Sequence, residues 1–255
     1  MRLSVSGARG AFGLFFIAGS ALLLSAPAQA QEVAQIPTPP LTPAPSARAA
    51  GPSASLWVGG DVSTDSFAFG SGLTFALNGN LYSDGLLLRG TVGLGDYDIG
   101  PPGTPRAHFA SAALLVGYQG HLGDVFVAGF AGPQLNNNSH GAPASVAGTQ
   151  FNGLFTGEIG IPAGRVDLSA WGSYSTFQNQ FTISGRALYR VLPGFRLGPQ
   201  VAYSGGNTWH RGRVGGFTSI YMRNSALEIG GGYSWNPDTG AGEGVYGNMS
   251  LSFPF

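Results

Sequence analysis

Apolar and polar residues alternate along residues 56–255 with the period of two that is typical of β-strands. For example, Val166 and Leu168 fall on one face of a strand, whereas Asp167 and Trp171 fall on the opposite face. No window of this region has the apolar stripe of an amphipathic helix. The pattern predicts twelve strands, which span residues 55–62, 67–78, 84–96, 108–120, 124–135, 150–161, 165–177, 180–192, 195–205, 208–221, 225–235 and 243–254.

Most of these segments have a length suited to crossing a bilayer, because a tilted transmembrane strand needs about 9–11 residues. Alternate connections would lie on the same side of an up-and-down barrel, and one side receives short turns such as 121–123 and 192–194. The other side receives the longest connections, 97–107 and 136–149. This asymmetry is typical of outer-membrane barrels. We therefore predict an all-β fold, an antiparallel up-and-down transmembrane β-barrel of about twelve strands (10–12), with both termini on the periplasmic side.

Composition separates this prediction from a soluble β-sandwich, which also alternates but carries a charged outer face. Only 9% of the 255 residues are charged and 43% are hydrophobic. All twelve basic residues are Arg, so Lys, which commonly protects exposed strand edges, is absent from the sequence. The formal net charge is zero and there is no Cys. We therefore expect no nucleic-acid partner, no metal and no cofactor.

The N-terminus has the features of an export signal. Residues 1–10 carry two Arg and no acid, residues 11–25 are apolar, and Ala28-Gln29-Ala30 fits a signal-peptidase site. A membrane anchor is the alternative, but the apolar run is shorter than the roughly 20 residues that a spanning helix needs. We predict a signal peptide at 1–30, a Pro/Ala-rich periplasmic linker at 31–55 and an outer-membrane barrel at 56–255.

The C-terminus predicts how the barrel is inserted. The chain ends at Phe255, and Phe253 precedes it on the same strand face. A final strand that ends in an aromatic residue is the type that the outer-membrane barrel assembly machinery accepts. We therefore expect Phe255 and Phe253 to form the assembly signal, with that machinery and outer-membrane lipid as partners.

The polar strand faces predict the inner wall of the barrel. Two interpretations stay open: Arg–carboxylate pairs that brace the wall, or a polar path for a solute or polymer. The candidate lumen-lining residues are Arg89, Glu158, Asp167, Trp171, Arg186, Arg190, Arg196, Gln200, Arg211, Arg213 and Glu228.

Three of the four Trp, at positions 57, 209 and 235, lie near predicted strand ends, where an interfacial aromatic girdle is expected. Trp171 falls on a polar face, where it would fill the lumen or stack on a sugar ring.

The sequence offers no catalytic residue. Barrel enzymes that cleave lipids place a His and a Ser two residues apart on one strand face, and none of the four His is followed by Ser at that spacing. Glu158 and Asp167 lie on neighbouring strands, as a paired-carboxylate site would require. We expect each of them to pair with an Arg instead, and we expect no enzymatic activity.

Five segments resemble the bacterial cellulose biosynthesis protein BcsS family. Across residues 84–255 they are Asp84-Gly85-Leu86-Leu87-Leu88-Arg89 with Tyr97, Val116-Gly117-Tyr118-Gln119, Leu197-Gly198-Pro199-Gln200, Arg211-Gly212-Arg213-Val214-Gly215-Gly216-Phe217, and Gly231-Gly232-Tyr233 before a terminal Phe. The family more often has an acid at the position of Gln200. The resemblance implies an exported outer-membrane role in making or exporting cellulose, and it supplies no catalytic residue.

We therefore expect a non-enzymatic outer-membrane barrel that assists cellulose biosynthesis or secretion. It would act as a conduit for cellulose, or as a docking site for components of the synthase complex through the 31–55 linker. A general small-solute porin is the alternative, and a lipid-modifying barrel enzyme is less favoured because the His-x-Ser arrangement is missing.

Overall fold

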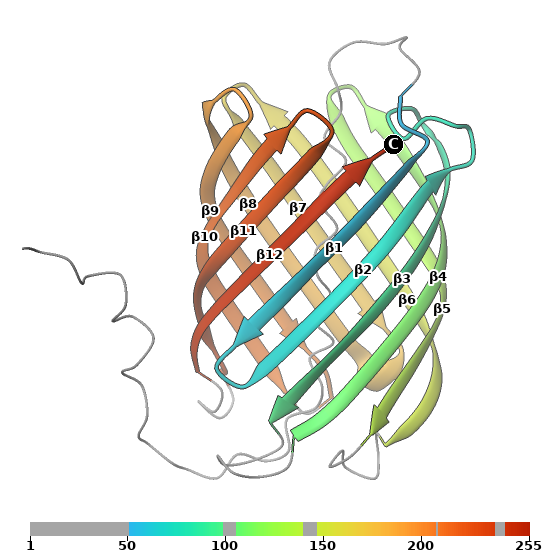
Figure 1. Cartoon of the computed structure of the whole chain (residues 1–255), viewed down its shortest axis with the longest axis vertical. Helices are drawn as coiled ribbons and strands as arrows, with labels where there is room; N and C mark the ends of the chain where they lie inside the picture. Colours follow the sequence, from blue (N-terminus) through green and yellow to red (C-terminus); the bar gives the residue numbers. More distant parts are fainter. Residues whose placement is uncertain (1–50, 99–105, 140–146, 208, 238–242) are drawn as a thin grey trace, which may run out of the picture.

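The structure is a closed barrel of twelve antiparallel strands (Figure 1). This computed structural model describes residues 51–98, 106–139, 147–207, 209–237 and 243–255. The strands are β1 (Ala54–Ser63), β2 (Ser66–Ala76), β3 (Gly85–Asp98), β4 (Arg106–Leu122), β5 (Val125–Ser139), β6 (Gly148–Ala163), β7 (Val166–Ser175), β8 (Gln180–Leu192), β9 (Phe195–Gly205), β10 (His210–Met222), β11 (Ser225–Trp235) and β12 (Gly244–Pro254). A short 3-10 helix, η1 (Phe177–Asn179), joins β7 to β8. The predicted fold class is confirmed.

The first and last strands close the sheet. β1 pairs with β12 from Ser55 opposite Pro254 to Ser63 opposite Tyr246. Beside this ladder, the backbone N–H of Ala54 donates to the carbonyl of Phe255 at 2.9 Å, and that of Phe255 donates back at 2.8 Å. A sheet in lipid must close in this way, because no water is present to satisfy the N–H and C=O groups of a free edge.

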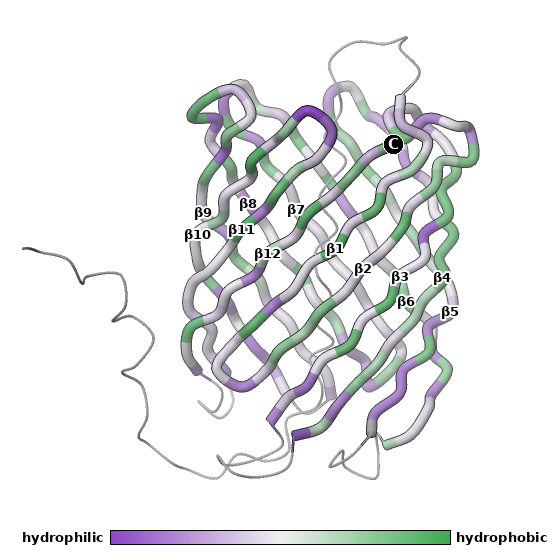
Figure 2. Tube along the Cα trace, viewed as in Figure 1, coloured by the Kyte–Doolittle hydropathy of each residue, from purple (hydrophilic) through white to green (hydrophobic). Residues whose placement is uncertain are grey.

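Alternation along the strands separates a lipid-facing wall from an inner wall. Val92, Leu114 and Ile183 are 59%, 55% and 57% exposed, whereas Arg89 is 3% exposed. Hydrophobic and hydrophilic positions accordingly follow one another along most strands (Figure 2). Apolar side chains thus cover the outer surface of the barrel, as contact with lipid acyl chains requires.

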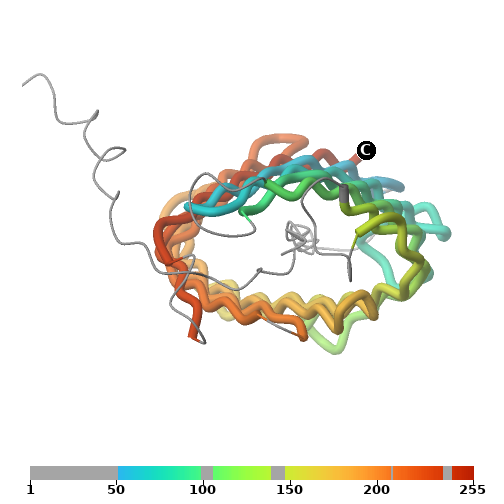
Figure 3. The backbone as a smooth tube through the Cα atoms, turned by 90° about the horizontal axis from the view of Figure 1, so that it is seen from below, coloured from blue at the N-terminus to red at the C-terminus, as the bar shows by residue number. Residues whose placement is uncertain are grey.

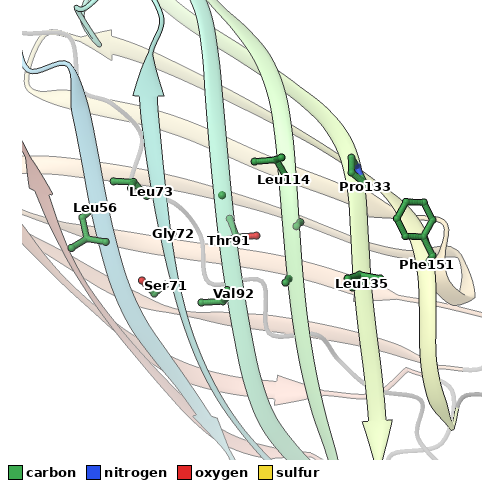
Figure 4. Close-up of a pocket in the computed structure, with 13 residues that line it drawn as sticks. Leu56, Ser71, Gly72, Leu73, Thr91, Val92, Leu114, Pro133, Leu135 and Phe151 are labelled. Atoms are coloured by element: carbon green, nitrogen blue, oxygen red, sulfur yellow. The ribbon is translucent and has the colours of Figure 1, made fainter.

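The outer wall is hollowed where β1 to β6 cross its middle. A depression of about 510 Å³ lies there between apolar side chains that include Leu73, Val92, Leu114 and Phe151 (Figure 4). Small residues such as Gly90 also line it. Its apolar lining belongs to the surface that meets lipid.

The two ends of the barrel differ. At the end that carries both barrel termini, four of the five connections are two-residue turns, and Gly123 and Gly164 adopt φ values of 63° and 65° there. Such turns need a positive φ, which glycine adopts without strain. At the opposite end, β4, β5 and β6 reach 17, 15 and 16 residues, against 10 for β1. These strands are longer than predicted, because they continue into segments that the sequence suggested were loop.

Seen along its axis, the barrel is a flattened oval (Figure 3). Part of its interior is apolar. Between β2 and β6, buried side chains pack into one cluster made of Ala76, Leu81, Leu87, Leu115, Phe126, Ala128, Phe130 and Leu154. The inner wall is therefore not uniformly polar.

The predicted signal peptide (1–30) and most of the predicted linker (31–55) lie outside the described residues. β1 begins at Ala54, which is two residues before the predicted start of the barrel. Among the described residues, no helix is long and apolar enough to cross a membrane.

Candidate functional site

The eleven predicted lumen-lining residues differ in burial. Asp167 and Arg196 are partly buried, with side chains 16% and 14% exposed, and the Arg190 side chain is 45% exposed near the end of β8. The other eight are buried: Arg89, Glu158, Trp171, Arg186, Gln200, Arg211, Arg213 and Glu228. For all of these except Trp171, hydrogen bonds between strands that are not neighbours show that the buried side chains project into the barrel.

Arg89 on β3 and Glu158 on β6 meet inside the barrel. Nη1 of Arg89 lies 2.7 Å from Oε1 of Glu158, although β4 and β5 separate their strands. Arg89 also donates from Nε to the hydroxyl of Thr74 at 3.1 Å. Its guanidinium carbon lies 3.6 Å from the centroid of the Phe130 ring. The charge of Arg89 is thereby neutralised by Glu158, and its guanidinium stacks on Phe130 and is hydrogen-bonded to Thr74.

A second polar network covers the inner faces of β8 to β11. Arg186 lies 3.4 Å from the carboxylate of Glu228 and donates from Nε to the amide oxygen of Gln200 at 3.2 Å. Ser219 and Ser250 donate to the same carboxylate at 3.3 and 3.4 Å. The buried carboxylate of Glu228 thus has three hydrogen-bond donors around it, which offset the cost of burying its charge.

The network continues through β12 to β1. The amide nitrogen of Gln200 donates to the hydroxyl of Tyr246 at 3.3 Å, and the guanidinium carbon of Arg213 lies 4.8 Å from the Tyr246 ring centroid. Arg213 then binds both carboxylate oxygens of Asp61, at 2.9 and 3.2 Å. A continuous set of contacts therefore braces the inner wall from β8 to β1.

Three further ion pairs lie toward the two ends of the barrel. Nη2 of Arg211 lies 2.5 Å from Oδ2 of Asp65, in the β1–β2 turn. At the end with the short turns, Asp167 lies 2.9 Å from Arg196 and 3.6 Å from Arg190. Asp167 and Glu158 are therefore bound by different arginines.

The β2–β3 connection, residues 77–84, folds into one end of the barrel. The amide nitrogen of Gln119 donates to the carbonyls of Leu81 at 2.7 Å and Ser83 at 2.6 Å. Burial raises the pKa of the Tyr82 hydroxyl above its usual value. Leu81 is 1% exposed and joins the buried cluster that also contains Leu87, Leu115, Phe126 and Phe130. This connection fills part of the interior with apolar side chains.

Two of the three tryptophans expected in an interfacial girdle do not lie there. Trp57 and Trp209 are both 6% exposed, whereas Trp235, at 36%, faces outward. A Cβ added to Gly72 would lie 2.5 Å from the indole nitrogen of Trp57, so the ring lies over this glycine. The expectation for Trp57 failed because it relied on the distance from the strand end and not on the strand face. Trp171 is 8% exposed, on the inner wall.

Several inner-wall residues are not among the eleven predicted from the sequence. Asp61, Gln119 and Tyr246 each hold part of the networks described above. Asp61 lies four residues after Trp57 and hence on the same strand face, so alternation could have identified it. Nothing in the sequence indicates that Gln119 binds a connection that folds inward.

The chemistry available at this wall is bracing and hydrogen bonding. The buried acids Asp61, Glu158 and Glu228 are each paired with an arginine. His121 contacts Asp84 at 2.6 Å near the short-turn end. Within the described residues, no group of His, Asp and Glu could hold a metal ion.

Comparison with solved structures places the fold among outer-membrane barrels. An outer membrane channel from Pseudomonas putida F1 aligns with a TM-score of 0.55 at 12% identity, over 86% of this chain and 99% of that chain. The KdgM porin aligns with a TM-score of 0.46 at 10% identity, over 79% and 99%. The translocator domain of the autotransporter NalP from Neisseria meningitidis aligns with a TM-score of 0.44 at 12% identity, over 79% and 87%. The likeness to the Pseudomonas putida channel, at 12% identity, is one of fold.

No curated protein sequence matches the chain significantly. The family model of cellulose biosynthesis protein BcsS matches residues 55–255, which is the whole barrel but for its first residue. This match confirms the resemblance of the five segments, and the structure places their residues Arg89, Gln119, Gln200 and Arg213 on the inner wall. The chain therefore belongs to the cellulose biosynthesis protein BcsS family and is a twelve-stranded outer-membrane β-barrel related to cellulose biosynthesis.

Proposed function

We propose that this protein is a non-enzymatic outer-membrane barrel that assists the secretion of cellulose. The observation that carries the proposal is that the BcsS family match covers the barrel itself, residues 55–255. The part of the chain related to cellulose biosynthesis is then a closed cylinder with hydrogen-bonding side chains on its inner wall. A cylinder of this kind serves transport across the outer membrane or the attachment of other components to it.

The state of the charged groups supports a role without catalysis. A general acid or base needs a carboxylate that can exchange a proton with substrate. Glu158 and Glu228 are instead buried against Arg89 and Arg186, at 2.7 and 3.4 Å. Such pairs stabilise the ionised acids and brace the wall.

The proposal has two forms. In the first, the inner wall guides the polymer through the membrane. In the second, the barrel is a docking site for periplasmic components of the synthase complex, reached through the 31–55 linker. Assembly of the barrel by the outer-membrane machinery, with Phe255 and Phe253 as its signal, belongs to both forms.

Deletion of the gene in a cellulose-producing strain tests the proposal. We expect extracellular cellulose, measured by calcofluor or Congo red binding, to fall and to recover when the wild-type gene is supplied. Cellulose output that is unchanged by the deletion would contradict it.

A general small-solute porin is the second candidate, favoured by the presence of both charge signs on the inner wall, as in Arg213 and Asp61. Planar-bilayer recordings separate the two: steady ion conductance that sugars do not change favours the porin. The lipid-modifying enzyme remains the least favoured, and incubation with labelled phospholipid or lipid A without product would exclude it.

A further inference from the structure

The inner wall differs in chemistry from one side of the barrel to the other. From β8 to β1, buried Arg, Asp and Glu side chains bind one another, as in the Arg186–Glu228 and Arg213–Asp61 pairs. On β5 to β7 many of the inner side chains are uncharged amides and hydroxyls, beside the buried apolar cluster that contains Phe130 and Leu154. Two acids also lie there: Glu158, whose Oε1 is bound by Arg89, and Asp167, which is bound by Arg196 at the short-turn end.

Five residues on β5 to β7 bury polar atoms that have no hydrogen-bond partner in the described part of the chain. They are both amide atoms of Asn136, the amide nitrogen of Asn152, the hydroxyls of Thr156 and Ser173, and the indole nitrogen of Trp171. Asn136 is completely buried, and Ser173 and Trp171 are each 8% exposed. We call these five residues the neutral strip.

Strand register places the five residues along one side of the inner wall. Thr156 on β6 lies directly opposite Ser173 on β7, and Glu158 lies opposite Trp171. Asn152 is four residues before Thr156 on the same face of β6, with the buried Leu154 between them, and Asn136 on β5 lies opposite Gln150, two residues from Asn152. The strip therefore extends along β6 from the middle of the barrel toward the end with the long connections.

Outward neighbours confirm that the strip faces the interior. Leu135, Phe155 and Tyr174, which precede or follow strip residues in the chain, are 47%, 50% and 41% exposed. Because successive side chains of a strand point to opposite faces, Asn136, Thr156 and Ser173 point inward.

A buried donor or acceptor without a partner is unfavourable, and native proteins usually satisfy such groups with water or with a ligand. The strip offers amide donors and acceptors, hydroxyls and an indole, and none of these groups carries charge. The free Oε2 of Glu158 adds one acceptor beside Trp171. This combination suits a neutral ligand rich in hydroxyl groups, since each hydroxyl can both donate and accept.

We propose that the neutral strip is a binding site for a neutral glucan chain inside the barrel. This inference rests on the proposed function and deepens it, because it names the wall along which the polymer would lie. Asn136 and Asn152 bind sugar hydroxyls, and Trp171 offers its indole N–H and ring face. The charged side chains from β8 to β1 bind one another and do not contact the glucan.

Calorimetric titration of the purified protein in detergent micelles with cellohexaose tests the site. We expect the folded wild-type barrel to bind. Loss of one neutral hydrogen bond weakens binding by about three- to tenfold, so Asn136→Ala and Trp171→Phe should each have that effect. Trp57→Phe is the matched control and should bind like wild type, because its indole nitrogen is equally buried and unpartnered but lies on β1.

The inference is overturned if the folded wild-type protein does not bind cellohexaose, or if Asn136→Ala and Trp171→Phe both bind as tightly as wild type. It is also overturned if hexagalacturonate, the acidic probe, binds as tightly as cellohexaose. Should Trp171→Phe fail to fold, Asn136→Ala decides, because it removes an amide group that makes no hydrogen bond within the described residues.

The two proposals fail separately. If the protein does not bind cellohexaose but the deletion strain loses cellulose output, the binding site is refuted and the proposed function stands. If binding depends on the strip but cellulose output is unchanged by the deletion, the binding site stands and the proposed function is refuted.

Discussion

Arg89 lies 2.7 Å from the carboxylate of Glu158 across two intervening strands. Because Arg89 also lies 3.6 Å from the ring centroid of Phe130, this one side chain links β3, β5 and β6 through the interior. The pair is almost inaccessible, with 3% and 2% of the two side chains exposed. It therefore acts as an internal brace between β3, β5 and β6.

Replacing only one residue of the Arg89–Glu158 pair should destabilise the barrel more than replacing both. Arg89→Met leaves the buried carboxylate of Glu158 uncompensated, which should lower the free energy of unfolding by about 3–5 kcal/mol. The double variant Arg89→Met/Glu158→Met should lose less than either single variant, because no buried charge remains. Urea unfolding in micelles measures both.

Arg190→Met is the matched control for this cycle. Its half-exposed side chain lies 3.6 Å from Asp167, so its loss should change stability by only about 0–1 kcal/mol. If Arg89→Met is as mild as Arg190→Met, the brace has no energetic role.

A charge placed on the lipid-facing wall should destabilise the barrel according to its depth. Val92 lies in the middle of β3 and is 59% exposed, so Val92→Arg should cost about 2–4 kcal/mol. Val245 is 73% exposed at the start of β12, where the same change should cost about 0–1 kcal/mol. Unfolding in lipid vesicles measures the difference, and equal costs would argue against this membrane placement.

The inward connection between β2 and β3 should restrict the interior. Leu81→Ala removes a side chain that is 1% exposed, so it should cost about 2–5 kcal/mol and loosen the connection. Single-channel recordings should then show higher conductance than wild type. Leu77→Ala, in the same connection but 63% exposed, should change stability by no more than about 0.5 kcal/mol and leave conductance unaltered. Matching conductance in all three proteins would refute the restriction.

The C-terminal aromatic residue should matter for assembly beyond its place in the sheet. Phe255→Ala keeps the backbone hydrogen bonds to Ala54, at 2.9 and 2.8 Å, and removes only the ring. We expect the folded fraction in outer membranes, measured by heat-dependent gel mobility, to fall severalfold. Phe151→Ala, which removes a ring from β6 that is 74% exposed, against 62% for Phe255, should assemble normally. Normal assembly of both variants would show that the ring is not the signal.

Patterns that depend on neighbouring residues were predictable from the sequence. All twelve strands and their order follow from period-two alternation and turn spacing, because each strand pairs with its chain neighbour. The inward placement of Arg89 and Arg213 follows from the same alternation. Family membership followed from short segments that carry these inner-wall residues.

Features that depend on closure of the barrel were not predictable. Arg213 and Asp61 are 152 residues apart, and only the meeting of β1 with β12 brings them together. The inward fold of the β2–β3 connection depends on a cavity that exists only in the closed barrel. Trp57 was wrongly predicted to lie in the interfacial girdle, because that prediction used its distance from the strand end and not the strand face on which it lies.

The partition of newly made glucan across the outer membrane tests the central claim most directly. Inner membranes isolated from cells that lack the gene should synthesise glucan at the wild-type rate. In the intact cells, extracellular cellulose should fall and glucan should accumulate in the periplasm. Supplying the wild-type barrel should restore export. Equal extracellular cellulose with and without the gene, at equal synthesis rates, would contradict a role for this barrel in cellulose secretion.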